Sequence, residues 1–127
     1  LSKTKNVLIT TGIEHVNLTN QLRDKFFEKV SDKVFINNKS TNSIYLIYKP
    51  SFDDILSLLR NSKVLIACHG AITHASNSFD VKKVDILEKS KIVFYKRFTT
   101  YLKDYHPAYR TDFNSLKHEI YRLVQNS

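Results

Sequence analysis

Two histidines and a threonine surround a glycine near the middle of the chain. His69 precedes Gly70, and Thr73 and His74 follow it within four residues. Imidazole and hydroxyl groups donate hydrogen bonds to oxyanions, and the first amides of a helix have no partner within the helix. These donors suit a ligand that carries phosphate. The alternative is that Gly70 only permits a tight turn between two elements.

Other chemistries lack the residues that they require. A zinc site needs three or four converging ligands, and the five-residue spacing of His69 and His74 does not supply them, so we expect no metal. No serine lies on a nucleophile elbow at Gly70. The chain also contains neither a P-loop nor a dinucleotide fingerprint. We therefore expect no cofactor, and we assign no catalytic residue.

The elements on either side must position these groups. The apolar run Val64–Cys68 predicts a strand buried on both faces, with Cys68 as a small buried side chain, and residues 71–79 predict a helix. A second corner has the same form, because strand 7–10 runs through Thr11 and Gly12 into a predicted helix at 14–30. The threonine hydroxyls there either face a phosphate or bond to the local backbone.

The remaining patterns predict alternating strands and helices. We expect further strands at 34–36, 44–48 and 84–87, an edge strand at 92–95, a helix at 52–60, and a last helix that is capped by Thr111 or Asp112 and runs through Val124. His106-Pro107 should end the element before it. This order predicts an α/β fold in one domain over residues 1–127: a Rossmann-like, open, mostly parallel sheet with helices on both faces. Right-handed crossovers would place Gly12 and Gly70 at the same carboxyl edge, where ligands bind.

Composition indicates the class of partner. The chain has 20 Lys and Arg against 12 Asp and Glu, a net charge of +8, which favours an anionic partner. We find no apolar stretch long enough to span a membrane and no signal peptide. We therefore expect a cytoplasmic protein, with the inner face of the membrane as one place of action. The chain contains no Met and begins with Leu1, so we expect a piece of a longer protein.

Residues 57–66 and 69–75 resemble the nucleotide-sugar-binding half of GT-B glycosyltransferases. The closest likenesses are the heptosyltransferases of lipopolysaccharide synthesis and the lipid-linked N-acetylglucosaminyltransferases. The resemblance implies the donor-binding half of an enzyme of cell-envelope polysaccharide synthesis. It also implies that a helix start binds the diphosphate of a nucleotide sugar. The binding residues would be Thr11, Gly12, His69, Gly70, Ala71, Ile72, Thr73 and His74.

The resemblance has limits that affect the donor's identity. His74 stands four residues after Gly70, where the heptosyltransferase pattern has three, and Ser76 stands where the other family has a ribose-binding Glu. The general base of such enzymes lies on another domain. An acceptor domain or subunit would therefore be the second partner, and the fragment alone would be inactive.

A basic and aromatic segment supports a different function. Residues 91–110 interleave lysines and arginines with phenylalanines and tyrosines. Such a segment can follow a phosphate backbone and stack on bases, and it can contact anionic lipid headgroups. Its rings can also simply pack on the sheet. The alternative function is therefore a non-enzymatic module that binds nucleic acid or another polyanion.

Overall fold

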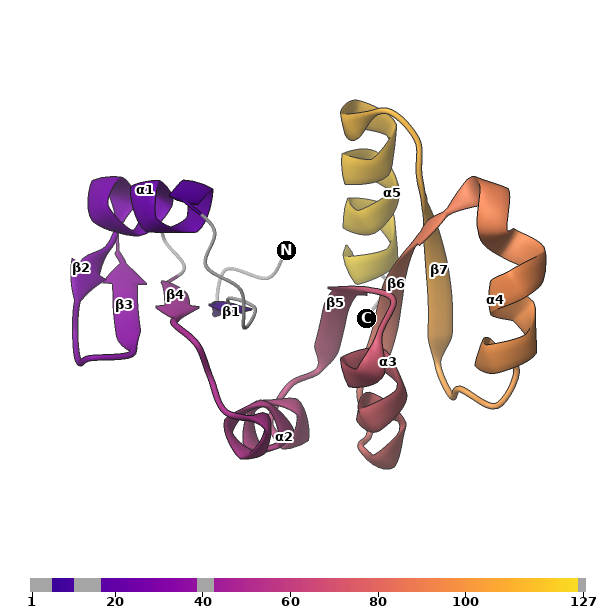
Figure 1. Ribbon diagram of the computed structural model, residues 1–127, viewed down its shortest axis with the longest axis horizontal. Helices are drawn as coiled ribbons and strands as arrows, with labels where there is room; N and C mark the ends of the chain where they lie inside the picture. The colour runs from indigo at the N-terminus through magenta and orange to yellow at the C-terminus, as the bar shows by residue number, and fades with distance from the viewer. Residues whose placement is uncertain (1–5, 11–16, 39–42, 126–127) are drawn as a thin grey trace. The chain divides into compact units, whose positions relative to one another are not determined.

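The computed structural model describes residues 6–10, 17–38 and 43–125 (Figure 1). Its internal contacts divide the chain into two compact units, Leu1–Ile55 and Leu56–Ser127. Apart from three successive strands between residues 28 and 47, helices and strands alternate along the chain, which confirms the α/β class. Among the described residues, no helix combines the length and the apolar character needed to cross a membrane.

The first unit is built on a mixed sheet. Its elements are β1 (Val7–Thr10), α1 (Asn17–Phe26), β2 (Glu28–Lys29), β3 (Val34–Asn37) and β4 (Ile44–Ile47). The strand order is β1-β4-β3-β2, with β1 parallel to β4 and the other pairs antiparallel. The helix expected at 14–30 ends earlier than predicted, because α1 stops at Phe26. After α1 the chain pairs Glu28 and Lys29 with β3, which gives their backbone groups partners outside a helix.

Helix α2 (Phe52–Arg60) matches its predicted bounds and contains the division between the units. Its start is fixed by a reciprocal cap. The Asp54 amide donates to the Ser51 hydroxyl at 3.1 Å, and the Ser51 amide donates to the Asp54 carboxylate at 3.0 Å. This hydrogen bonding lowers the pKa of Asp54.

The second unit is built on a parallel sheet of order β5-β6-β7. Its elements are β5 (Val64–Cys68), α3 (Ala71–Ala75), η1 (Ser76–Ser78), β6 (Lys82–Glu88), η2 (Lys89–Lys91), α4 (Ile92–Thr99), β7 (Tyr105–Arg110) and α5 (Phe113–Gln125). Asp112 caps α5, because its carboxylate accepts from the Ser115 amide at 2.9 Å. All three strands are parallel, as the sequence predicts for most of the sheet.

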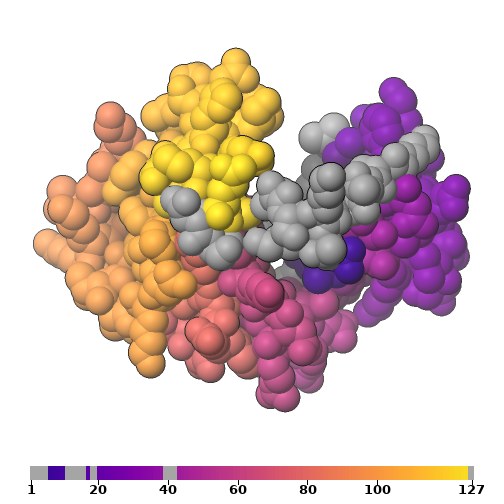
Figure 2. Space-filling view, turned by 180° about the vertical axis from the view of Figure 1, so that it is seen from behind, coloured from indigo at the N-terminus to yellow at the C-terminus, as the bar shows by residue number. Residues whose placement is uncertain are grey.

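Helices cover both faces of this sheet. Side chains alternate between the two faces along a strand, so the adjacent residues Val84 and Asp85 of β6 point to opposite faces of the sheet. Val84 packs with Ala108, Leu123 and Val124, which places α5 on its face. Asp85 accepts a hydrogen bond from Thr73 of α3, which places that helix on the other face. In Figure 2 the yellow atoms, which belong to α5, lie on the surface of this unit.

Two expectations for the last third of the chain are wrong. Residues 92–95 begin helix α4 rather than an edge strand. Parallel strands need a crossover between them, and α4 supplies it for β6 and β7, with Ile92, Tyr95 and Thr99 half-buried at helical spacing. Pro107 lies inside β7 instead of ending an element. Because β7 is an edge strand, the missing amide hydrogen is tolerated there.

The expected single sheet is also not formed. β1 and β5 belong to separate sheets, so the corners at Gly12 and Gly70 do not share the edge of one sheet; Thr11 and Gly12 themselves lie outside the described residues. β5 is an edge strand, which explains why Ile66 is 48% exposed although both faces of this strand were expected to be buried. Cys68, expected to be buried, is exposed for the same reason.

Candidate functional site

A buried carboxylate organises the carboxyl half of the parallel sheet. The side chain of Asp85, in the middle of β6, is 0% exposed. Three donors from different elements surround it. The Tyr105 hydroxyl donates at 2.7 Å, the Thr73 hydroxyl donates at 3.2 Å, and Nδ1 of His69 lies 2.7 Å from Oδ2. A buried carboxylate requires such partners, because burying an unpaired charge is costly.

Asp85 fixes the orientation of His69. Since a carboxylate can only accept, the hydrogen of His69 that faces it is on Nδ1. The His69 side chain is 14% exposed, and its amide donates to the carbonyl of Ile86 at 3.3 Å, which extends the β5 ladder by one residue. The Nε2 atom of His69 therefore faces away from the sheet in a fixed direction.

That Nε2 atom meets a second histidine. Nε2 of His74, at the end of α3, lies 3.2 Å from Nε2 of His69. The two rings are nearly perpendicular, with centroids 4.9 Å apart. On its other side, Nδ1 of His74 is hydrogen-bonded to the hydroxyl of Tyr101. Asp85, His69, His74 and Tyr101 thus form a continuous hydrogen-bonded chain that leads from the buried sheet to the surface.

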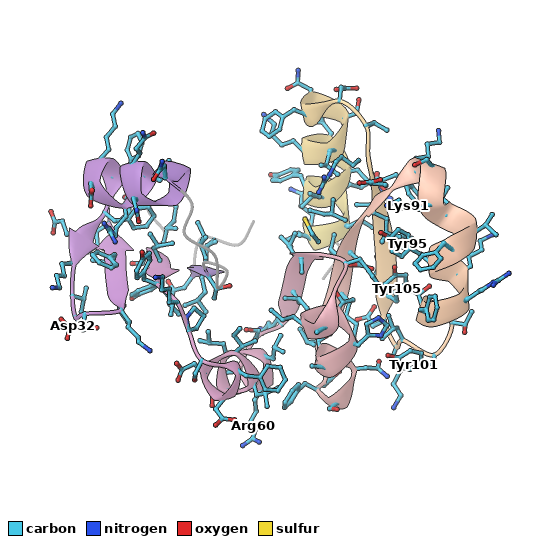
Figure 3. The ribbon with its side chains drawn as sticks, viewed as in Figure 1. Asp32, Arg60, Lys91, Tyr95, Tyr101 and Tyr105 are labelled. Carbon is cyan, nitrogen blue, oxygen red and sulfur yellow. The ribbon has the colours of Figure 1, made fainter. Side chains whose placement is uncertain are left out.

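Aromatic rings line this chain. Tyr95 of α4 lies with its ring centroid 4.8 Å from that of His69, and Tyr101 stacks on His74 at 5.7 Å. Figure 3 labels Tyr95, Tyr101 and Tyr105, which come from α4, the segment after it, and β7. Burial, together with the hydrogen bond to Asp85, raises the pKa of Tyr105 well above its ordinary value. The Tyr105 hydroxyl therefore keeps its proton and donates to Asp85 at neutral pH.

Positive charge lies at the carboxyl edge of the sheet, where β6 ends. Lys89 and Lys91 belong to η2, directly after the carboxyl end of β6, and both are exposed. Nζ of Lys91 lies 3.7 Å from the carboxylate of Glu88, which is also half exposed. Such a surface pair is weak, so Lys91 is available to an anionic ligand.

The predicted site residues separate into three groups. His69 and His74 are brought together, and Gly70, Ala71 and Ile72 lie between them at the start of α3. The Thr73 hydroxyl faces Asp85, and this residue is 1% exposed, so Thr73 acts through Asp85. Thr11 and Gly12 lie outside the described residues. Helix α3 has only five residues, so its macrodipole adds little and the site depends on side chains.

Gly70 has little conformational reason to be glycine. Its φ of 176° is extended, which any residue adopts, and a Cβ there would meet only the Cys68 carbonyl oxygen at 3.8 Å. The absence of a side chain leaves the space beside the start of α3 open. On the other face of the sheet edge, the exposed Cys68 thiol accepts a hydrogen bond from Arg110.

Sequence reasoning missed Asp85, Tyr101 and Tyr105 as parts of the site. A signal for Asp85 was present, because a carboxylate inside the apolar run Val84–Leu87 must find partners if the strand is buried. The two tyrosines carried no comparable signal. In the sequence they stand out only as members of the basic and aromatic segment, residues 91–110.

The arrangement favours binding and proton sharing over nucleophilic attack. Among the described residues, no serine, threonine or cysteine is hydrogen-bonded to either imidazole, so the base–nucleophile pair of a hydrolase is not formed. Within the same residues, no three His, Cys, Asp or Glu side chains are grouped to hold a metal ion. A hollow of about 270 Å³ lies at the opposite, amino end of β6, between residues 77–81 and 103–104.

Comparisons with known proteins add no further constraint. No family model, no curated protein and no solved structure matches this chain.

Proposed function

We propose that this chain binds the diphosphate of a nucleotide sugar, as the donor-binding half of a glycosyltransferase. The observation that carries the proposal is a pair of imidazoles that begins with His69, directly after β5 at the carboxyl edge of the parallel sheet, with Nε2 atoms 3.2 Å apart. Ligands of open α/β sheets bind at that edge. The resemblance of residues 57–75 to donor-binding domains points to the same position.

The two imidazoles are held in a prepared orientation. Because Nδ1–H of His69 faces Asp85, its Nε2 atom donates to a diphosphate when the ring is an imidazolium. Asp85 fixes the ring of His69, and Tyr101 fixes the ring of His74. Preorganised donors stabilise the charge that develops on a departing diphosphate, and they require no reorganisation at the moment of reaction. Gly70 leaves space for the ligand, and the Tyr95 ring forms an aromatic wall. Lys91 would add a positive charge on the same edge.

The experiment is a titration of the isotope-labelled chain with UDP-, GDP-, ADP- and CMP-sugars, followed by amide and imidazole NMR shifts. We expect one nucleotide class to shift signals of residues 69–74. His69→Ala and His74→Ala should each weaken binding at least tenfold. The matched control is His118→Ala, an exposed histidine on α5, which should leave the affinity unchanged within twofold.

Two results would reject the proposal. The first is the absence of shifts with every donor, measured both with a chelator and with added zinc. The second is binding that His118→Ala weakens as much as His69→Ala does. Lys91→Ala should reduce affinity less than the histidine variants, because its charge is exposed and screened by salt.

A second candidate function rests on the surface of α4. Val93, Phe94 and Phe98 are 75%, 58% and 48% exposed, and no acidic residue occurs between Lys89 and Lys103. Exposed rings beside cations are the elements of a single-strand or polyanion surface. If this function holds, affinity for a single-stranded oligonucleotide will fall steeply with salt and will be lost in Phe94→Ala/Phe98→Ala.

A further inference from the structure

The geometry points to a site for a divalent transition-metal ion, with Nε2 of His69 and Nε2 of His74 as the protein ligands. Imidazole is a preferred ligand of zinc, copper and nickel. The inference requires only the second unit, and it does not depend on the proposed nucleotide ligand.

The distances between the two rings fit two ligands of one ion. Their Nε2 atoms are 3.2 Å apart, whereas their centroids are 4.9 Å apart. Lines from each centroid through its Nε2 atom, for symmetrically placed rings, meet about 2 Å beyond the nitrogens, the length of a bond from imidazole to zinc. Two ligands of a tetrahedral zinc ion are separated by about 3.3 Å, which is close to the observed spacing.

Each imidazole also has an oxygen partner on its other nitrogen. Nδ1 of His69 faces the carboxylate of Asp85 at 2.7 Å, and Nδ1 of His74 faces the hydroxyl of Tyr101. Metal-binding histidines almost always have such an outer partner, which orients the ring and raises its basicity. Neither His106 nor His118 shares this arrangement. His106 bonds to the exposed Asp104 through Nε2, and His118 is exposed on α5.

Two protein ligands leave coordination positions open. Since the described residues offer no third His, Cys, Asp or Glu at this place, water or the oxygens of an anionic ligand would fill the remaining positions. Catalytic zinc sites have three protein ligands and one open position; this pair supplies two, so at least two positions remain for water or an anionic ligand. A bound ion would therefore connect the imidazoles to a phosphate-bearing ligand without any change in the fold of the sheet.

The test is isothermal titration of the full, chelator-treated chain with Zn²⁺, repeated with Ni²⁺, in the absence of nucleotide. We expect one ion per chain and shifts of the imidazole signals of His69 and His74. His69→Ala and His74→Ala should each weaken the affinity at least tenfold. His15→Ala, His106→Ala, His118→Ala and Cys68→Ser should each keep it within twofold, which excludes adventitious binding by the other three histidines or by the thiol.

Two positioning residues extend the test. Asp85→Asn keeps the shape of the side chain but removes the carboxylate, and the loss of an outer partner lowers metal affinity about 10–100-fold. Tyr101→Phe should also weaken binding, and it leaves the buried sheet intact should Asp85→Asn fail to fold. The inference is overturned if no ion binds, or if His69→Ala binds as well as the natural chain.

The outcomes separate this inference from the proposed function. Metal binding without any nucleotide response supports the metal site and rejects the nucleotide ligand. Nucleotide binding in the presence of EDTA, with no metal bound in its absence, supports direct donation by the imidazoles and rejects the metal site. Nucleotide binding that appears only with Zn²⁺ supports both.

Discussion

At the scale of single residues, Asp85 determines the site. One carboxylate joins α3, the end of β5 and β7 through Thr73, His69 and Tyr105. None of these partners is a neighbour in sequence. A change at Asp85 would therefore disturb the fold and the site together, whereas Tyr105 offers a change confined to one bond.

Tyr105→Phe should lower stability at neutral pH and change its dependence on alkaline pH. Loss of a donor to a buried carboxylate costs about 1–3 kcal/mol. The raised pKa of Tyr105 means that the folded chain keeps a proton which the unfolded chain releases above about pH 10. The stability from this group is thus complete below pH 10 and is lost as pH rises further. The variant lacks that alkaline loss.

The measurement is urea unfolding of both proteins at pH 7 and at pH 10.5. The stability gap between them should narrow at the higher pH. Tyr121→Phe, an exposed tyrosine on α5, serves as the matched control and should behave like the natural chain. If the difference in unfolding free energy between the two proteins is the same at both pH values, Tyr105 has the same pKa in the folded and the unfolded chain, and this prediction is wrong.

At the scale of elements, local patterns predicted the helices and strands whose signals lie within their own residues. The Ser51 cap and the apolar spacing gave the bounds of α2. A cap at Thr111 or Asp112, with the stripe at Leu116, Ile120 and Leu123, predicted α5, and the structure has Asp112 as its cap. The prediction for α4 was wrong because Ile92–Tyr95 contains β-branched and aromatic residues, which are typical of strands. The segment is helical because the parallel strands β6 and β7 need a crossover between them. The prediction of the site was incomplete for the same reason, because the role of Asp85 depends on partners that are distant in sequence.

Leu123→Ala should destabilise the second unit strongly. Leu123 is 7% exposed and packs with Val84, Ala108 and Val124. Removing a buried leucine side chain costs about 2–5 kcal/mol. Phe113→Ala, on the same helix but 77% exposed, should change stability by less than about 0.5 kcal/mol. Urea unfolding followed by the NMR signals of β6 and α5 measures both, and equal losses would contradict this account of the core.

At the scale of the whole molecule, the two units contain different kinds of structure. The first has a mixed sheet, and the second has the parallel sheet, its covering helices and every described residue of the site. The basic and aromatic segment also belongs to the second unit. The features that carry chemistry are thus collected in little more than half of the chain.

A fragment of residues 50–127 should fold and keep the site. The division between the units falls inside α2, so the fragment must begin before Ser51 to retain the reciprocal cap with Asp54. Its core is small, and domains of this size are only marginally stable, so a lower midpoint of thermal unfolding than in the full chain is expected.

The amide signals of residues 64–124 should nevertheless keep the dispersion of the full chain, with shifts largest near α2. Zinc affinity should remain within twofold, because His69, His74, Asp85 and Tyr101 all lie in the fragment. A fragment that is unfolded at 25 °C would show that the second unit requires the first for stability, and that the site is a property of the entire chain.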